Sequence, residues 1–371
     1  MKESRHSQES MTQDVSIYFH IPFCTKKCPY CHFYVIPNQK SFHEILDVGL
    51  SLEWERQLPL LLNKRIVSIY FGGGTPTLFV DGIQKILEKI AQQFTLDCEI
   101  TVEANPEDAS FELFEKLKAC KVNRISLGVQ SLDDRSLQTL ERIHSAKKAE
   151  EAILLAAQAG FVNISIDLMY DLPDQTEASW MYSLSKLESL PIQHLSLYNL
   201  TIEPHTAFYK RRNSLTFPTG ETSLRFLTRA VEQLESLGLK RYEISAFGRP
   251  SVHNVGYWTG RPFLGFGPSA FSFWNGERFR NCANLQRYTR ALKEGKSPVD
   301  FREKLQEEQR IREKIAIQLR LLDGIDANLP THVLETLEVL VNQNLLMKKN
   351  GRIFLTDLGL LFHDTVASQI V

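Results

Sequence analysis

Short apolar stretches alternate along the chain with longer segments whose apolar residues recur every three to four positions. Segments of the second kind include 81–93, 111–120 and 146–159, and their spacing is typical of amphipathic helices. Strands that alternate with helices favour a parallel α/β sheet, and six or more such units favour a complete or partial barrel. The short stretches are predicted strands at 15–20, 66–71, 99–104, 124–130, 163–168 and 194–198.

Within these strands, apolar side chains occupy every second position, as Ile100 and Val102 do in 99–103. Successive side chains of a strand face opposite sides, so one face packs under the helices and the other is small or polar. An ordinary eight-unit barrel fills its interior with bulky branched residues, so a polar lining indicates a hollow or ligand-filled interior. A half-exposed antiparallel sheet would alternate in the same way, but the intervening helices disfavour it.

The pattern changes after about residue 300. Helical spacing covers 303–322 and 331–343, and 346–354 predicts a hairpin around an Asn-Gly turn. Helices followed by a hairpin resemble a winged helix, which raises the hypothesis of DNA binding. Residues 301–371, however, carry nine basic and ten acidic side chains, a poor match to a phosphate backbone. We therefore expect this segment to serve in packing or as a lid.

Composition and charge narrow the class of protein. The 371 residues carry 43 basic and 44 acidic side chains, whereas a nucleic-acid binder more often has a basic excess. No apolar run is long enough to predict a membrane span, and the polar N-terminus lacks the apolar core of a secretory signal. We expect a soluble, cytosolic protein. Its predicted parts are a disordered tail at 1–13, a barrel at 14–250, a connecting segment at 251–300 and a C-terminal α+β domain at 301–371.

Three of the six cysteines, Cys24, Cys28 and Cys31, lie within eight positions directly after the first predicted strand. Crowded thiols in a reducing compartment indicate metal or redox chemistry, and thiolates are the usual ligands of iron–sulfur clusters. Three thiolates can hold three corners of a [4Fe-4S] cubane and leave the fourth iron open. The alternative is a structural zinc site with His20 or His32 as fourth ligand, although closed zinc sites usually combine two separated pairs.

Further candidate residues stand where predicted strands end. The glycines at 72–74 follow the second strand and would let a ligand approach the backbone, without the lysine of a P-loop. Four polar residues stand at the ends of further predicted strands. Active sites of barrel enzymes lie at the carboxyl ends of the strands, so we expect the cysteines, the glycines and these four residues to share one rim. Each polar residue taken alone could equally be a satisfied buried group. The polar residues are Glu103, Gln130, Asp167 and Tyr198.

The segments 18–24 and 28–31 resemble the radical S-adenosylmethionine (SAM) superfamily, in the branch of anaerobic coproporphyrinogen III oxidases and HemW-type haem chaperones. This resemblance implies an α/β fold, a partial (β/α)6-type barrel followed by a small winged-helix-like domain. It also implies a [4Fe-4S] cluster on the three cysteines, with SAM at its open iron. Further matches lie at 72–77, 103–106, 128–131, 142–144, 167–170 and 242–245. The implied SAM contacts are Tyr18, Tyr30, Gly73, Gly74, Thr75, Glu103, Gln130, Arg142 and Asp167.

Two features separate the branches of this family. The oxidases of this branch carry the pattern C-x3-C-x2-C-x-C. Here Phe33 occupies the place of the fourth cysteine, which resembles the HemW-like pattern. The segment 253–258 matches the H-N-x-x-Y-W motif that is linked to haem binding in that branch. A histidine is a natural axial ligand of haem iron, so the resemblance implies that His253 contacts haem. The alternative is that His253 only forms hydrogen bonds inside the fold.

The resemblance thus implies a protein that carries haem as cargo to an acceptor protein, which could be membrane-associated, and that receives electrons from a donor. No nucleic-acid partner is expected. The enzymatic alternative is oxidative decarboxylation of coproporphyrinogen III, and a third hypothesis is a scaffold without a cluster. Four positions depart from the family pattern: His32 replaces an aspartate, and Glu141, Asp171 and Asp174 replace glycines.

Overall fold

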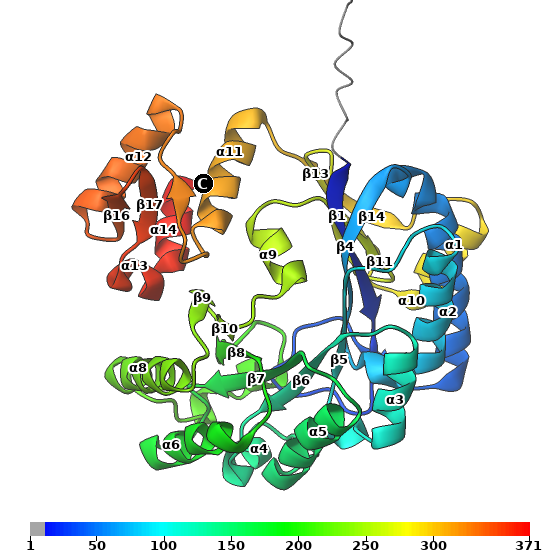
Figure 1. Ribbon diagram of the computed structural model, residues 1–371, viewed down its shortest axis with the longest axis horizontal. Helices are drawn as coiled ribbons and strands as arrows, with labels where there is room; N and C mark the ends of the chain where they lie inside the picture. The colour runs from blue at the N-terminus through cyan, green and yellow to red at the C-terminus, as the bar shows by residue number, and fades with distance from the viewer. Residues whose placement is uncertain (1–11) are drawn as a thin grey trace, which may run out of the picture.

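The computed structural model describes residues 12–371, and a twelve-stranded sheet forms its frame (Figure 1). Its centre is a run of parallel strands in chain order: β1 (Gln13–Ile21), β4 (Lys64–Gly73), β5 (Glu99–Ala104), β6 (Arg124–Gln130), β7 (Ile164–Tyr170) and β8 (His194–Asn199). The sheet is curved (Figure 1), and its edge strands β14 (Val299–Lys304) and β9 (Arg241–Glu243) do not pair with each other, so the barrel is open. The predicted α/β partial barrel is confirmed. Of the tail predicted at 1–13, residues 1–11 lie outside the described residues, and β1 begins at Gln13.

Helices cover the outer face of the parallel strands (Figure 1). They are α1 (Lys40–Leu61), α2 (Val80–Ala91), α3 (Phe111–Ala119), α4 (Asp134–Thr139), α5 (Ala146–Gln158), α6 (Glu177–Lys186) and α8 (Gly220–Ser236). In α2, Ile83, Ile86, Leu87 and Ile90 are buried, the spacing of a helix face. They pack on the apolar set of strand residues, including Ile100 and Val102. Short 3-10 turns η1 (Pro76–Phe79), η2 (Pro106–Asp108), η3 (Leu187–Ser189) and η4 (Arg212–Ser214) join these elements.

Antiparallel strands extend the sheet at both ends. Beyond β1 lie β11 (Phe263–Phe266), which is parallel to β1, then β12 (Phe271–Trp274), β13 (Glu277–Asn281) and β14 (Val299–Lys304). Beyond β8 lie β10 (Ala246–Gly248) and β9 (Arg241–Glu243). The remaining elements are β2 (Phe23–Cys24), β3 (Ile36–Pro37), α7 (Ala207–Lys210), α9 (Val252–Trp258) and α10 (Leu285–Lys293).

The helix predicted at 303–322 is wrong at both ends. It is α11 (Glu307–Gln318), and the residues before it belong to β14, which crosses the domain boundary predicted at residue 300. Ion pairs to β13 explain the difference, because Arg302 pairs with Glu277, and Glu303 lies 2.9 Å from Arg278. These cross-strand pairs of opposite charge add to the backbone ladder between β13 and β14, which holds residues 299–304 extended.

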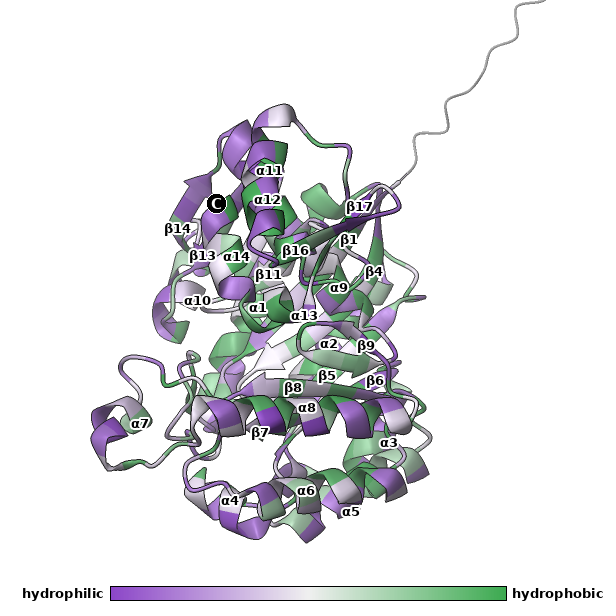
Figure 2. Ribbon diagram, turned by 90° about the vertical axis from the view of Figure 1, so that its left-hand side faces the viewer, coloured by the Kyte–Doolittle hydropathy of each residue, from purple (hydrophilic) through white to green (hydrophobic). Residues whose placement is uncertain are grey.

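The C-terminal segment has a separate hydrophobic core, which includes Leu319, Leu337 and Ile353. Figure 2 shows hydrophilic and hydrophobic residues mixed along α11 (Glu307–Gln318) and α12 (Thr331–Asn342). The predicted hairpin joins β16 (Leu346–Lys349) to β17 (Arg352–Leu355), with φ of 51° at Asn350 and 73° at Gly351, which fits a tight Asn-Gly turn. Besides α11, the elements are β15 (Ile325–Asp326), α12 (Thr331–Asn342), β16 (Leu346–Lys349), β17 (Arg352–Leu355), α13 (Asp357–Leu361) and α14 (His363–Ile370).

Candidate functional site

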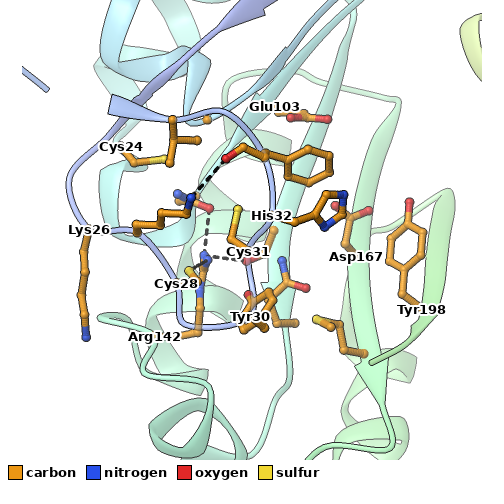
Figure 3. A pocket seen from close by; sticks show the side chains of 18 of the residues that line it. Cys24, Lys26, Cys28, Tyr30, Cys31, His32, Glu103, Arg142, Asp167 and Tyr198 are labelled. Carbon is orange, nitrogen blue, oxygen red and sulfur yellow. Dashed lines mark hydrogen bonds between the residues drawn. The ribbon is translucent and has the colours of Figure 1, made fainter. Parts of the chain in front are cut away.

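A cavity of about 470 Å³ opens at the carboxyl ends of the parallel strands (Figure 3). Its volume lies in the range that holds small ligands and cofactors. The wall joins the cysteine loop (residues 24–35) to the ends of β4 to β8. The structure therefore places most of the predicted site residues on one rim. These are Cys24, Cys28, Tyr30, Cys31, Gly73, Gly74, Glu103, Gln130, Arg142, Asp167 and Tyr198.

The cysteine loop is held at both ends by the short parallel pair β2 and β3, in which Cys24 lies opposite Pro37. Within the loop, the amide of Cys31 donates to the carbonyl oxygen of Cys28 at 3.1 Å. The Cys24 Sγ lies 3.8 Å from Thr75 Oγ1, which places Thr75 beside the cavity wall. Burial raises the pKa of Cys24 to about 11 and also raises that of Cys31. The thiols must therefore lose protons when they bind iron.

Arg142 joins the cysteine loop to the barrel. Its Nη1 donates to Cys28 Sγ at 3.3 Å, and its Nη2 donates to Asn105 Oδ1 at 2.8 Å. Asn105 in turn donates from Nδ2 to Thr75 Oγ1 at 2.8 Å. The buried cation and this amide hold three segments of the rim in register. Asn105 was not among the predicted site residues, although its place directly after β5 was a usable signal.

The glycine turn brings bare backbone to the cavity. Gly73 has a φ of 114°, and its amide donates to Glu103 Oε2 at 3.1 Å. A Cβ on Gly74 would lie 2.5 Å from the Phe23 carbonyl oxygen, so a side chain cannot be accommodated there. Burial raises the pKa of Glu103 to about 7 and that of Asp167 to about 6. The two carboxyls thus titrate near neutrality and face a ligand-sized space.

Three predicted residues do not line this cavity. Thr75 lies behind its wall, and the other two lie in the floor cluster (Ser68, Glu99, His253 and Tyr257) or next to it. His253 is 1% exposed, and its ring nitrogens lie 2.9 Å from Ser68 Oγ and 2.8 Å from Tyr257 Oη. Tyr18 is buried with its ring 6.4 Å from that of His253. Both ring nitrogens of His253 are thus already bonded, and its contact with haem stays a prediction.

The histidine proposed as a zinc ligand in the alternative hypothesis is also occupied. His20 contacts Tyr18 Oη through Nδ1 at 3.1 Å and the Tyr34 carbonyl oxygen through Nε2 at 2.9 Å. Both nitrogens serve the fold, so His20 is a poor fourth ligand for the thiols. His32 lines the cavity instead.

Three of the four departures from the family pattern share a backbone conformation that suits the glycines they replace. Glu141, Asp171 and Asp174 have φ values of 53°, 59° and 58°. Glycine adopts this left-handed region without strain, whereas other residues do so at a cost. The Asp171 carboxylate compensates by accepting hydrogen bonds from Asn199 and Ser223.

The donor set fits a [4Fe-4S] cluster with SAM. Cys24, Cys28 and Cys31 all line the cavity, and the same cavity offers the acceptors Glu103 and Asp167 and the bare glycine turn. The thiols would hold the cluster. The turn and the carboxylates would receive the amino and hydroxyl groups of a SAM molecule, whose positive sulfonium suits a site with ionised carboxyls. When bound, such a cluster supplies an open iron and an electron.

Comparison with known proteins defines the class first. Residues 18–187 match the model of the radical SAM superfamily. A solved structure of the coproporphyrinogen III oxidase HemN from Escherichia coli superposes with a TM-score of 0.84 and 23% identity, covering 97% of this chain and 90% of that one. This likeness shows a shared fold. A [4Fe-4S] cluster and SAM are the cofactors that membership in the superfamily implies.

Sequence relatives then define the family. The "Heme chaperone HemW" of Lactococcus lactis is 32% identical over 93% of this chain and 94% of its own length. The protein of the same name from Bacillus subtilis is 33% identical over 84% of each chain. The chain belongs to the HemW family of the radical SAM superfamily. No helix within residues 12–371 is long and apolar enough to cross a membrane.

Proposed function

We propose that this protein is a haem chaperone that binds haem and transfers it to an acceptor protein. The observation that carries the proposal is relatedness over nearly the whole chain to proteins of that name, in both the barrel and the C-terminal domain. Phe33 agrees with it, because the position where the oxidase pattern has a fourth cysteine here carries an aromatic side chain that is 54% exposed at the cavity mouth.

The proposed cofactor site uses the residues of the rim. Cys24, Cys28 and Cys31 hold the cluster, and Arg142 offsets part of its negative charge through its contact with Cys28. Glu103 and Asp167 orient SAM and hold its hydroxyls. We further propose an electron donor that reduces the cluster, an acceptor that takes the haem, and a cytosolic location for the chain.

Anaerobic reconstitution tests this function. The full-length protein is loaded with iron and sulfide, and ferric haem and coproporphyrinogen III are added to separate samples. A haem chaperone gives a stable haem complex by absorbance and no sustained formation of protoporphyrinogen IX after reduction. Steady protoporphyrinogen production would favour the oxidase, and iron and sulfide contents near zero would favour a scaffold without a cluster.

The motif at 253–258 provides a second arm of the test. If the wild-type protein fails to bind haem, and His253→Ala behaves like it, the proposed function is wrong.

A further inference from the structure

We propose that His32, at the mouth of the cavity, is the axial ligand of the haem iron. This inference rests on the haem-binding function proposed above and names the site. His32 follows Cys31 directly, is exposed and lines the cavity. Its ring packs on that of Phe33 with the centroids 4.6 Å apart. In the part of the chain that the structure describes, its ring nitrogens have no hydrogen-bond partner, so either can bind iron.

Other histidines near the barrel are committed to the fold. His253 contacts Ser68 and Tyr257, and His194 contacts Ser165 at 2.7 Å and Tyr242 at 3.0 Å. Burial lowers the pKa of His253 to about 3, so the ring is neutral, but both of its nitrogens are already engaged. An iron bond at His253 would require a buried hydrogen bond to break and a haem-sized space to open in the floor. His32 needs neither change.

The surface around His32 suits a flat apolar macrocycle. Phe33, Ile143 and Tyr198 are 54%, 51% and 44% exposed, and all three line this cavity. Large apolar side chains that gather on one exposed opening mark a binding surface. Figure 3 shows the His32 ring between the cysteine loop and the side chains of Asp167 and Tyr198. A porphyrin bound there would lie across the mouth, above the space assigned to SAM.

The cysteine loop also provides cations for the two propionates of haem. Lys26 and Lys27 both line the cavity. Lys27 Nζ donates to the Phe33 carbonyl oxygen at 3.3 Å, next to the ring that would contact the porphyrin. Lys26 lies 3.4 Å from Glu141, a carboxylate that is also neutralised by Arg211 at 2.7 Å. Glu203 is a further carboxylate on the rim, so we expect the propionates to lie toward Lys27.

Haem titration of the reconstituted full-length protein tests this site. The variants are His32→Ala, His253→Asn and the matched control His205→Ala, whose exposed histidine does not line the cavity. Loss of the iron ligand should weaken haem binding by about tenfold or more and remove the histidine-ligated Soret band and electron paramagnetic resonance (EPR) signal. Added imidazole should restore the spectrum of His32→Ala. His205→Ala should match the wild type.

Iron and sulfide contents show whether each variant keeps its cluster. His32→Gln is the second variant if His32→Ala loses iron. In a separate arm, Lys27→Ala should weaken binding of haem but not of haem dimethyl ester, whose propionates are uncharged.

Each outcome decides a different claim. A wild-type protein that binds no haem contradicts both the function and the site. A wild type that binds haem while His32→Ala and His32→Gln keep its spectrum and affinity overturns the site alone. A loss confined to His253→Asn would place the iron at His253.

Discussion

The two ends of the barrel use polar residues in opposite ways. In the floor cluster, Glu99 accepts hydrogen bonds from Ser251 Oγ and from the amides of Val252 and His253 at 3.0 to 3.3 Å, and thereby caps α9. At the mouth, polar groups of the same strands surround a cavity of about 470 Å³. The same strands run from one end to the other. The two ends therefore differ in their surroundings: protein groups bond the polar side chains at the floor, and a cavity adjoins them at the mouth.

This contrast separates structure from function. A buried polar group bonded to another part of the protein contributes to stability and specifies the fold. Polar groups that line a cavity, with carboxyl pKa values raised toward neutrality, are typical of a ligand site. Substitutions at the floor should therefore change stability, and substitutions at the mouth should change ligand binding.

The largest expected effect is at the cysteine loop. Cys28→Ala should reduce the iron and sulfide retained after anaerobic reconstitution to near zero, because a cubane cannot be held by two thiolates of this loop. Cys120→Ala, which removes a thiol on the far side of the sheet, is the matched control and should keep the full content. Equal iron contents in the two variants would contradict the assignment.

The next largest effect is expected on stability, when the carboxylate of Glu99 in the floor cluster is removed. Glu99→Ala leaves three donors without an acceptor and should lower the free energy of unfolding by about 3 kcal/mol. Glu99→Gln retains one oxygen acceptor and should lose less. Urea unfolding measures both. A loss under about 1 kcal/mol in Glu99→Ala would mean that the floor cluster contributes little to stability.

SAM binding should depend on pH in a direction set by the mouth carboxyls. The pKa values of Glu103 and Asp167 are about 7 and 6, so both are largely protonated at low pH and become ionised as the pH rises. The cationic ligand favours the ionised forms, so its affinity should rise about tenfold between about pH 5.5 and 7.5 and then level off. Calorimetric titration measures this. Asp167→Asn should flatten the profile, and an affinity that falls with rising pH would contradict the assignment.

The smallest expected effect concerns backbone strain behind the mouth. Asp174→Gly removes a side chain from a residue with a φ of 58° and should raise the free energy of unfolding by about 1 kcal/mol. Asp171→Gly relieves similar strain but loses the bonds from Asn199 and Ser223, so it should gain less. Thermal unfolding of the two variants compares them, and a larger gain in Asp171→Gly would be inconsistent with this account.

Much of the fold could be predicted because its signals are local. Alternation in 99–104 gives both the strand and the side that faces the cavity, and the Asn-Gly turn fixes the hairpin of β16 and β17. The parallel order of the strands then follows from the intervening helices. The start of β14 could not be predicted, because its partner β13 is known only from the fold.

Most residues of the candidate site could be predicted from the sequence, whereas the contacts between them could not. Residues at strand ends, such as Glu103 and Asp167, reach the rim because all parallel strands end there. The links from Arg142 to Cys28 and Asn105 join residues far apart in the chain, and no local pattern reveals them. The hydrogen bond between His253 and Ser68 likewise joins residues far apart in the chain, so the sequence left open whether His253 bonds inside the fold or contacts haem.

The most direct test of the mouth as a cofactor site is EPR spectroscopy of the reduced, reconstituted protein with and without SAM. The account predicts that SAM shifts the signal of the reduced cluster, because one iron is open to the ligand, and that Asp167→Asn needs more SAM to produce the same shift. Identical spectra in the presence and absence of saturating SAM would contradict it.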